Sequence, residues 1–370
     1  MRGALLACAL LAAAPAFART FDVMAYGAKG DGRADDSAAI ERTMAAADEA
    51  GGGRVHLPAG RYRARVVVRS GIELAGDGAG ATVIVAPESR GYADNSYAGF
   101  GRLVSSVTVR GLSVEADVAR SSWAAGIRFA GSSGVRVEDV TVTGSQHGQG
   151  IVFDEAPGFG SDNLVLGCTV KNSSQGIVVD NENARVIGNV VEGCKYGISM
   201  EYATPHAAVV SGNIVDGRGR SGSVGIIASA ADSAVVSGNS VRGVDLGLYL
   251  KEGPSRMTVE SNSVFDAAVA GIRLDGGSFN AIRGNSVHGA KGRGIRLEDS
   301  VDSEVSGNFV TDSGREGILL LSVSRTRVWG NRIVRAGAAG VSISGGADND
   351  ISGNSFSRTK DHPKALEKDL

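Results

Sequence analysis

A short glycine-led phrase that recurs between Gly126 and Gly345 constrains the fold of this chain more than any other feature. It reads Gly-Ile-Arg-Leu-Asp at Gly271 and Gly-Ile-Arg-Leu-Glu at Gly294, and its last copies are spaced by 23 residues. The copies begin at Gly126, Gly150, Gly176, Gly197, Gly225, Gly247, Gly271, Gly294, Gly317 and Gly340. Self-similarity at a fixed period above ~20 residues marks an architecture of stacked coils.

A column of asparagines runs in phase with the glycine phrase. Each follows a Gly or, at Asn262, a Ser, and apolar residues lie three positions before and two positions after it. The column comprises Asn189, Asn213, Asn239, Asn262, Asn285, Asn308, Asn331 and Asn354. An apolar strand, a corner and a second apolar strand therefore recur in every repeat, with β-branched residues preferred. We predict an all-β fold, a single-stranded right-handed parallel β-helix, in which each coil buries its inward side chains on its neighbours.

The side chains within each phrase alternate in character. The first and third residues after the glycine are apolar in the copies quoted, so we assign them to the core, and the second and fourth are expected to face solvent. The fourth position reads, coil by coil, Asp154, Asp180, Glu201, Ser229, Lys251, Asp275, Glu298, Leu321 and Ser344. The second position reads Arg128, Val152, Val178, Ser199, Ile227, Tyr249, Arg273, Arg296, Leu319 and Ser342. One outer wall is thus expected to carry a row of charge, and we place the function there.

Composition and the first residues limit the possible fold class, ligands and location of the protein. The net charge of −2, with 54 Gly and 7 Pro in 370 residues, fits a turn-dense all-β protein, and no basic run indicates nucleic-acid binding. Residues 1–18 are typical of a secretory signal peptide: Arg2, an apolar run and an Ala-Phe-Ala site, with too few apolar residues to span a bilayer. We therefore expect a periplasmic or secreted protein without a membrane span.

The exported part, residues 19–370, is expected to form one β-helix domain. It would have an N-terminal cap at 19–60, coils at about 61–356 and a polar tail at 357–370. Its two cysteines do not suit a disulfide. Cys168 matches the asparagine corner, whereas Cys194 lies five residues beyond the next corner, roughly 15 Å away at ~3.3 Å per residue. Two free, buried thiols are the simpler expectation.

The segment after the signal peptide carries a recognisable motif. It reads Phe-Asp-Val-Met-Ala-Tyr-Gly-Ala-Lys-Gly-Asp-Gly-Arg-Ala-Asp-Asp from Phe21, then Ser37, a helical stretch through Ala50, and Gly-Gly-Gly-Arg-Val-His-Leu-Pro-Ala-Gly-Arg-Tyr to Tyr62. Ser37 is suited to be the N-cap of a helix with an apolar stripe that plugs the open end of the coils. The motif resembles the N-terminal segment of the pectate-lyase-3 family, which is rhamnogalacturonase/epimerase-like and related to family 28 glycoside hydrolases.

This resemblance implies a β-helix that acts on or binds a polysaccharide. It leaves the reaction open, because the superfamily includes hydrolases, lyases, epimerases and phage tailspikes. The Asn-Thr-Asp, Gly-His-Gly and Arg-Ile-Lys set of family 28 does not occur in order here, which counts against polygalacturonase activity.

The acidic half of the row comprises Asp154, Asp180 and Glu201 on three successive coils. At ~4.8 Å per coil, neighbouring carboxyls would be ~5 Å apart and the outer two ~10 Å apart. Those spacings suit the carboxylate pairs of glycosidases, and stacked carboxylates raise one another's pKa. The same trio could hold Ca²⁺, although the sequence requires no cofactor. A plain solvated row of charge is the third interpretation.

The basic half comprises Lys251, Arg273 and Arg296, interleaved with Asp275 and Glu298. Ion pairs between neighbouring coils would explain this arrangement structurally. Functionally, the arginines could clamp the carboxylate of a uronate, and a Lys near other cations has a lowered pKa and can act as a base. Lys251 and Arg273 resemble the Lys/Arg pair of the alginate-lyase and chondroitinase-B β-helix family. The acidic calcium ligands that this family places before its Lys are absent here.

Tyr202 and His206 follow Glu201 in a short Tyr-Ala-Thr-Pro-His segment. The segment is similar to the Tyr…Asp-Pro-His site of alginate C5-epimerases, but it is one residue shorter and has Thr in place of Asp. A Tyr and a His beside carboxylates are credible acid/base partners. His147, just before Gly150, is another candidate.

Our leading hypothesis is removal of the C5 proton from a uronate in an anionic polysaccharide, by a lyase or an epimerase. Lys251 or Tyr202 would be the base, His206 the acid, and Arg273 and Arg296 the clamp. Hydrolysis by Asp154, Asp180 and Glu201 is the second hypothesis, and non-catalytic glycan binding is the third. The remaining residues expected to contact substrate are Tyr249, Asp275, Glu298 and His147.

Overall fold

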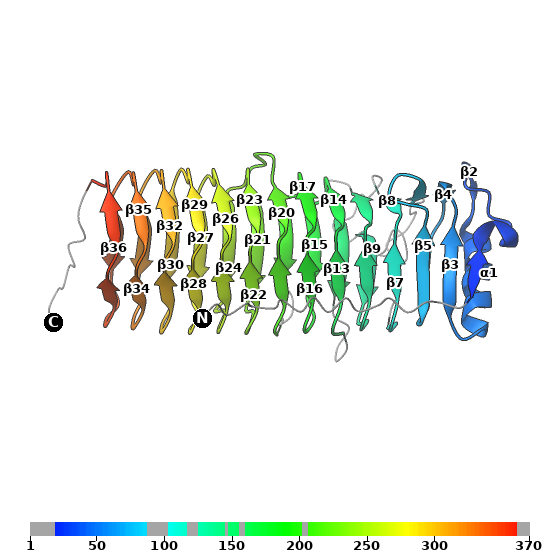
Figure 1. Cartoon of the computed structure of the whole chain (residues 1–370), viewed down its shortest axis with the longest axis horizontal. Helices are drawn as coiled ribbons and strands as arrows, with labels where there is room; N and C mark the ends of the chain where they lie inside the picture. The colour runs from blue at the N-terminus through cyan, green and yellow to red at the C-terminus, as the bar shows by residue number, and fades with distance from the viewer. Residues whose placement is uncertain are drawn as a thin grey trace, which may run out of the picture.

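The computed structural model describes residues 19–86, 103–116, 125–144, 147–154, 160–201 and 206–360. In these residues the chain winds into a rod of stacked coils with three parallel sheets along its length (Figure 1). Each regular coil adds one strand to each sheet, and every strand pairs in parallel with its equivalents on the adjacent coils. The predicted right-handed parallel β-helix is confirmed.

The bounds of the strands are as follows. Sheet A contains β1 Thr20–Asp22, β3 Gly53–Leu57, β5 Ile72–Gly76, β7 Thr108–Arg110, β10 Arg136–Glu138, β13 Leu164–Leu166, β16 Arg185–Ile187, β19 Val209–Ser211, β22 Val235–Ser237, β25 Thr258–Glu260, β28 Ala281–Arg283, β31 Glu304–Ser306, β34 Arg327–Trp329 and β37 Asp350–Ser352. Sheet B contains β2 Asp31–Asp35, β4 Gly60–Arg63, β6 Thr82–Val85, β8 Ser113–Glu115, β11 Thr141–Thr143, β14 Thr169–Lys171, β17 Val190–Glu192, β20 Ile214–Asp216, β23 Ser240–Arg242, β26 Ser263–Phe265, β29 Ser286–His288, β32 Phe309–Thr311, β35 Arg332–Val334 and β38 Ser355–Ser357. Sheet C contains β9 Ala125–Ala130, β12 Gln149–Asp154, β15 Gln175–Val179, β18 Tyr196–Met200, β21 Val224–Ser229, β24 Leu246–Lys251, β27 Ala270–Asp275, β30 Arg293–Glu298, β33 Ile318–Leu321 and β36 Val341–Ser344.

The glycine of the repeated phrase lets sheet C approach sheet B. A Cβ atom built on Gly271 would lie 2.3 Å from Cγ1 of Val287 and 2.7 Å from the carbonyl oxygen of Gly294 on the next coil. Both distances are below van der Waals contact, so a larger residue would push the sheets apart. The glycine column is therefore a packing requirement of the narrow tube.

The asparagine column forms a hydrogen-bonded ladder inside a corner of the tube. Asn285 donates its Nδ2 to Oδ1 of Asn308 at 3.0 Å and to the carbonyl of Val259 at 2.9 Å. Its backbone N–H also donates to Oδ1 of Asn308, at 2.9 Å. The ladder thus satisfies buried backbone groups that the turn would otherwise leave unpaired.

The two cysteines in the described residues, Cys168 and Cys194, are free and buried, as predicted. Cys168 occupies an asparagine position, and its backbone N–H donates to Oδ1 of Asn189 at 2.8 Å. Burial raises the pKa of the Cys168 thiol to about 12 and that of Cys194 to about 11.

The helix α1, Ser37–Glu49, lies at the N-terminal end of the stack, preceded by the short 3-10 helix η1, Val23–Tyr26 (Figure 1). Ile40, Met44 and Ala47 are buried in the same core cluster as the coils. Ser37 is not the N-cap, so that prediction is wrong: Asp36 occupies the position, and its carboxylate instead accepts N–H bonds from the preceding loop. In the described part of the chain, no helix is both long and apolar enough to cross a bilayer.

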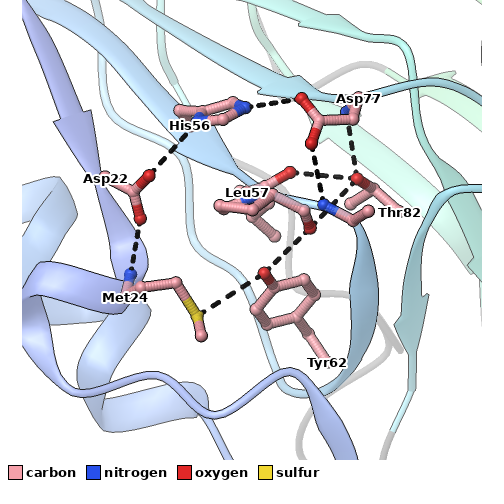
Figure 2. A network of polar contacts seen from close by, with 9 residues as sticks. Asp22, Met24, His56, Leu57, Tyr62, Asp77 and Thr82 are labelled. Atoms are coloured by element: carbon pink, nitrogen blue, oxygen red, sulfur yellow. Dashed lines mark hydrogen bonds and ion pairs between the residues drawn. The ribbon is translucent and has the colours of Figure 1, made fainter.

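A polar network ties the first coils together (Figure 2). His56 lies between two carboxylates, with Nε2 2.8 Å from Oδ1 of Asp77 and Nδ1 3.4 Å from Oδ2 of Asp22. The fully buried Tyr62 donates its hydroxyl to the carbonyl of Pro58 at 2.9 Å. Burial, followed by the charge of nearby carboxylates, raises the pKa of Tyr62 to about 12.

Candidate active site

The expected row of charge lies on the outer wall of sheet C. Strand pairing places Ser229 opposite Lys251 and Asp275 opposite Glu298. The second position follows the same register, because Arg273 pairs with both Tyr249 and Arg296. The alignment predicted from the repeated phrase is therefore confirmed for these strands.

Several positions of this wall do not face water, and the prediction that they would is wrong. Val152 and Val178 are buried, and with Ala125 they form a small apolar cluster separate from the main core. Asp180 and Ser229 are each only 1% exposed. The alternation correctly predicts which residues point out of the tube, but it does not show which of them their surroundings cover.

Asp154, Asp180 and Glu201 each contact a different donor. Asp154 is ion-paired with Arg128 on the preceding coil. Oδ1 of Asp180 accepts the backbone N–H of Glu201 at 2.9 Å. Among the described residues, no three His, Cys, Asp or Glu side chains form a group that could hold a metal ion. Within the described residues, Asp154, Asp180 and Glu201 thus do not form the Ca²⁺-binding group that was one interpretation of this row.

Lys251 forms ion pairs with two carboxylates of the wall. Its Nζ lies 3.2 Å from Oε1 of Glu201, two coils back, and 3.3 Å from Oε1 of Glu252. The hydroxyl of Ser229, on the intervening coil, donates to the other oxygen of Glu252. The ion pair crosses that coil because serine is too small to obstruct it.

These contacts change the expected pKa of the Lys251 side chain. Burial alone would lower the pKa of its ammonium group, but hydrogen bonds and charge from Glu201, and then from Glu252, outweigh burial and raise the pKa. The prediction of a lowered pKa is wrong, because the nearest charges are carboxylates and not other cations. Lys251 is therefore a stable ammonium group at neutral pH.

The expected arginine clamp is already ion-paired. Arg273 contacts Asp275 through two nitrogens, at 2.8 Å and 2.7 Å, and its guanidinium lies 5.0 Å from the ring centre of Tyr249. Tyr249 donates its hydroxyl to Asp275 at 2.9 Å, and its pKa is raised first by burial and then by that carboxylate. Arg296 pairs with Glu298 at 2.5 Å. These contacts support the structural interpretation of this half of the row.

The histidine candidates lie at the two ends of the sheet C strands. His206 follows β18 at the corner, and its Nδ1 lies 3.3 Å from Oδ2 of Asp232. His147 is exposed and precedes β12, so it lies at the opposite end of that strand from Asp154. Tyr202 lies outside the described residues. The structure therefore brings His206, but not His147, to the end of sheet C that carries the charged row.

Sequence reasoning missed three residues that contact the candidate groups: Ser229, Glu252 and Asp232. Glu252 directly follows Lys251, and Ser229 occupies the charged column, so both positions were visible in the sequence. Their contacts were not, because those depend on side chains that reach along the wall. Asp232 pairs with His206 across a 26-residue coil that departs from the regular repeat.

The fold and this wall define a class: a right-handed parallel β-helix with ionic side chains aligned on one sheet. Residues 20–226, more than half of the chain, match the model of the family described as rhamnogalacturonase A/epimerase, pectate lyase-like. The chain belongs to this family. Residues 210–364 also match a model described as periplasmic copper-binding protein (NosD).

Two curated relatives from Azotobacter vinelandii are named for alginate chemistry. Mannuronan C5-epimerase AlgE1 is 27% identical over 282 residues, which cover 69% of this chain and 18% of the relative. Alginate lyase 7 is 41% identical over 73 residues, covering 17% of this chain and 8% of the relative. The aligned segments thus span less than a fifth of the length of these relatives.

Solved structures share the fold at low identity. The A-module of Azotobacter vinelandii mannuronan C5-epimerase AlgE6 matches with a TM-score of 0.61 and 20% identity, over 94% of this chain and 96% of that one. The Streptococcus pneumoniae surface adhesin PfbA matches with a TM-score of 0.65 and 14% identity, over 95% and 96% of the two chains. At these identities the matches establish the fold alone.

Proposed function

We propose that this protein modifies a uronate-containing polysaccharide along the outer wall of sheet C, by removing the proton at C5 of a uronate. The ion pair of Lys251 with Glu201 carries the proposal, since it holds a stable cation on the wall. Relatives named as a mannuronan C5-epimerase and an alginate lyase support the substrate class.

Lys251 is assigned the task of binding the uronate carboxylate, in exchange for its contact with the exposed Glu252. The C5 proton is acidic enough to remove only when negative charge can move onto that carboxylate, and a nearby ammonium group stabilises this charge. The raised pKa keeps Lys251 protonated, which suits this role and not that of the base. Arg273, one coil further on and bound to Asp275, is positioned to orient the neighbouring sugar.

His206 is assigned the proton transfer. In the tautomer whose Nδ1–H is donated to Asp232, Nε2 carries the lone pair that accepts the C5 proton. Asp232 follows Ser229 by three residues, so its Cα lies at most ~11 Å from that coil's position on the row. The electron pair from the C5–H bond moves into the carboxylate.

Two products are then open. Protonation of the opposite face of C5 by water gives the epimer, and His206 then releases the proton it has taken to solvent. Breakage of the C4–O bond gives a C4=C5 double bond, with the imidazolium of His206 protonating the departing oxygen.

We also propose that the protein is exported to the periplasm or the medium, with residues 1–18 removed as a signal peptide. These residues lie outside the described part of the chain. The periplasmic protein family matched by residues 210–364 supports this location. We assign α1 the role of a cap, because its buried side chains continue the core at the end of the stack.

A non-catalytic glycan-binding role is the second candidate. It is favoured by the ion pairing of Arg273 with Asp275 and of Arg296 with Glu298, which leaves this part of the wall nearly neutral. Such a surface could bind a polysaccharide without changing it.

Incubation with polymannuronate, alginate and pectate distinguishes these functions. Elimination would raise ultraviolet absorbance from the new C=C bond, epimerisation would change the uronate composition without it, and hydrolysis would give reducing ends alone. We expect one of the first two outcomes, reduced at least ~100-fold in kcat/KM by Lys251→Met. The control Lys171→Met, on sheet B and paired with Glu192, should stay within about 2-fold of the wild type. Polymer binding without any product would support the second candidate instead.

A further inference from the structure

A second surface feature lies around the corner from the charged row, on sheet A. A hollow of about 360 Å³ opens there across three coils, within the size range of small-molecule sites. Its lining includes Phe279, Ala281, Glu304, Arg325 and Arg327. Strand pairing aligns Ala281, Glu304 and Arg327 on successive coils, with the small alanine side chain leaving the space.

The hollow combines an apolar platform with polar groups. Phe279 is 61% exposed, the largest exposure among the large apolar side chains of the described residues. Burial of such a ring against a ligand is favourable, and an aromatic face suits the apolar C–H face of a pyranose.

Arg327 supplies the group most available to a ligand. Its side chain is 63% exposed, and its Nε lies 3.7 Å from Oδ2 of Asp350, too far for a hydrogen bond. Arg325, in contrast, is held by Asp302 through two contacts of 2.7 and 2.8 Å. Arg327 therefore retains donors for a carboxylate or for sugar hydroxyls.

The hollow lies close in sequence to the candidate active site. Phe279 follows Asp275 by four residues, so their Cα atoms are at most ~14 Å apart. A polymer that leaves the sheet C wall near this coil can pass round the corner and reach the hollow.

We propose that this hollow is a second sugar-binding site, which holds a pyranose residue of an anionic polysaccharide with its ring on Phe279 and its carboxylate on Arg327. The identity of the polymer rests on the function proposed above, whereas binding in the hollow does not require catalysis. The site would retain the polymer beside the wall of sheet C.

The test is equilibrium binding of polymannuronate, measured by affinity electrophoresis and calorimetry, with dextran as a neutral polymer. We expect Phe279→Ala and Arg327→Ala each to raise the Kd for polymannuronate about 5-fold or more, without affecting migration in dextran. Ala281→Phe, which fills the hollow, should act in the same direction. The matched control is Phe265→Ala, an exposed aromatic on sheet B, which should leave the Kd within about 2-fold.

Unchanged affinity in both Ala281→Phe and Phe279→Ala would overturn the proposal, as would absence of polymannuronate binding by the wild-type protein. A wild-type protein that binds the polymer but turns over no substrate would refute the proposed chemistry. The affinity changes of the variants would still test whether the hollow is a sugar-binding site.

Discussion

The buried side chain of Tyr62 makes the stability of the N-terminal coils depend on pH. Its folded-state pKa of about 12 lies above the ordinary value of 10, so the unfolded chain loses this proton first. The stabilisation is therefore complete below about pH 10 and disappears as the pH rises through about 12. A shift of this size corresponds to roughly 2–3 kcal/mol.

We predict that Tyr62→Phe costs about 1 kcal/mol in the free energy of unfolding at pH 7, through loss of the hydrogen bond to Pro58. The carbonyl of Pro58 keeps a contact with Thr82 at 3.2 Å, which limits the loss. Urea denaturation of both proteins at pH 7, 9, 10.5 and 11.5 should show the wild-type advantage shrinking above pH 10. A difference that stays constant across this range would contradict the assigned pKa.

Gly271 tests the packing of sheet C against sheet B. We predict that Gly271→Ala lowers the free energy of unfolding by at least about 2 kcal/mol, because the new methyl group would overlap Val287. The double variant Gly271→Ala/Val287→Ala should lose less than the sum of the two single changes, since the shortened valine makes room. Additive losses in chemical denaturation would show that the glycine has another role.

The sequence predicted the position of site residues better than their pKa or burial. The columns at the second and fourth positions of the phrase follow from periodicity, and strand pairing confirms them. The raised pKa of Lys251 did not follow, because it depends on Glu201 reaching across the coil of Ser229. Burial of Asp180 was equally invisible, since alternation specifies direction and not what covers a side chain.

At the scale of elements, the asparagine ladder fixes one corner of every regular coil. The sequence located it through the recurrent Gly-Asn pair, but the pattern indicated only a turn. The structure shows that each amide before the last, Asn354, bonds both to the next asparagine and to backbone groups of neighbouring coils. Each of these asparagines therefore connects its own coil with the coils before and after it.

We predict that Asn285→Ala, in the middle of the ladder, destabilises the protein by about 2–4 kcal/mol, because it leaves several buried polar groups unpaired. The same change at Asn354, at the end of the ladder and partly exposed, should cost clearly less, since water can replace its bonds. Thermal unfolding of the two variants checks this order. Equal midpoints would indicate that the ladder does not act through buried hydrogen bonds.

The whole molecule behaves as a stack in which each coil contacts its neighbours. Residues 276–298 form one 23-residue repeat, from the position after Asp275 to its equivalent on the next coil, Glu298. We predict that deleting this repeat leaves a folded protein with cooperative unfolding, because the strands on either side meet in the same register. Deletion of residues 276–287 should prevent folding, because one coil would then lack its sheet A strand and two of the three residues of its sheet B strand.

Circular dichroism and size-exclusion chromatography of the two deletion variants make this comparison. If both fold equally well, or if the full-repeat deletion unfolds while the half-repeat deletion does not, the coils are not the independent units of this stack.

The central claim is that the wall of sheet C acts on C5 of a uronate, with Lys251 supplying the positive charge. The most direct measurement is incorporation of deuterium at C5 of polymannuronate in D₂O, followed by NMR. We predict incorporation, or loss of the C5 hydrogen with formation of a double bond, by the wild-type protein and neither by Lys251→Met. Absence of both C5 exchange and double-bond formation on uronate polymers that the protein demonstrably binds would contradict the account.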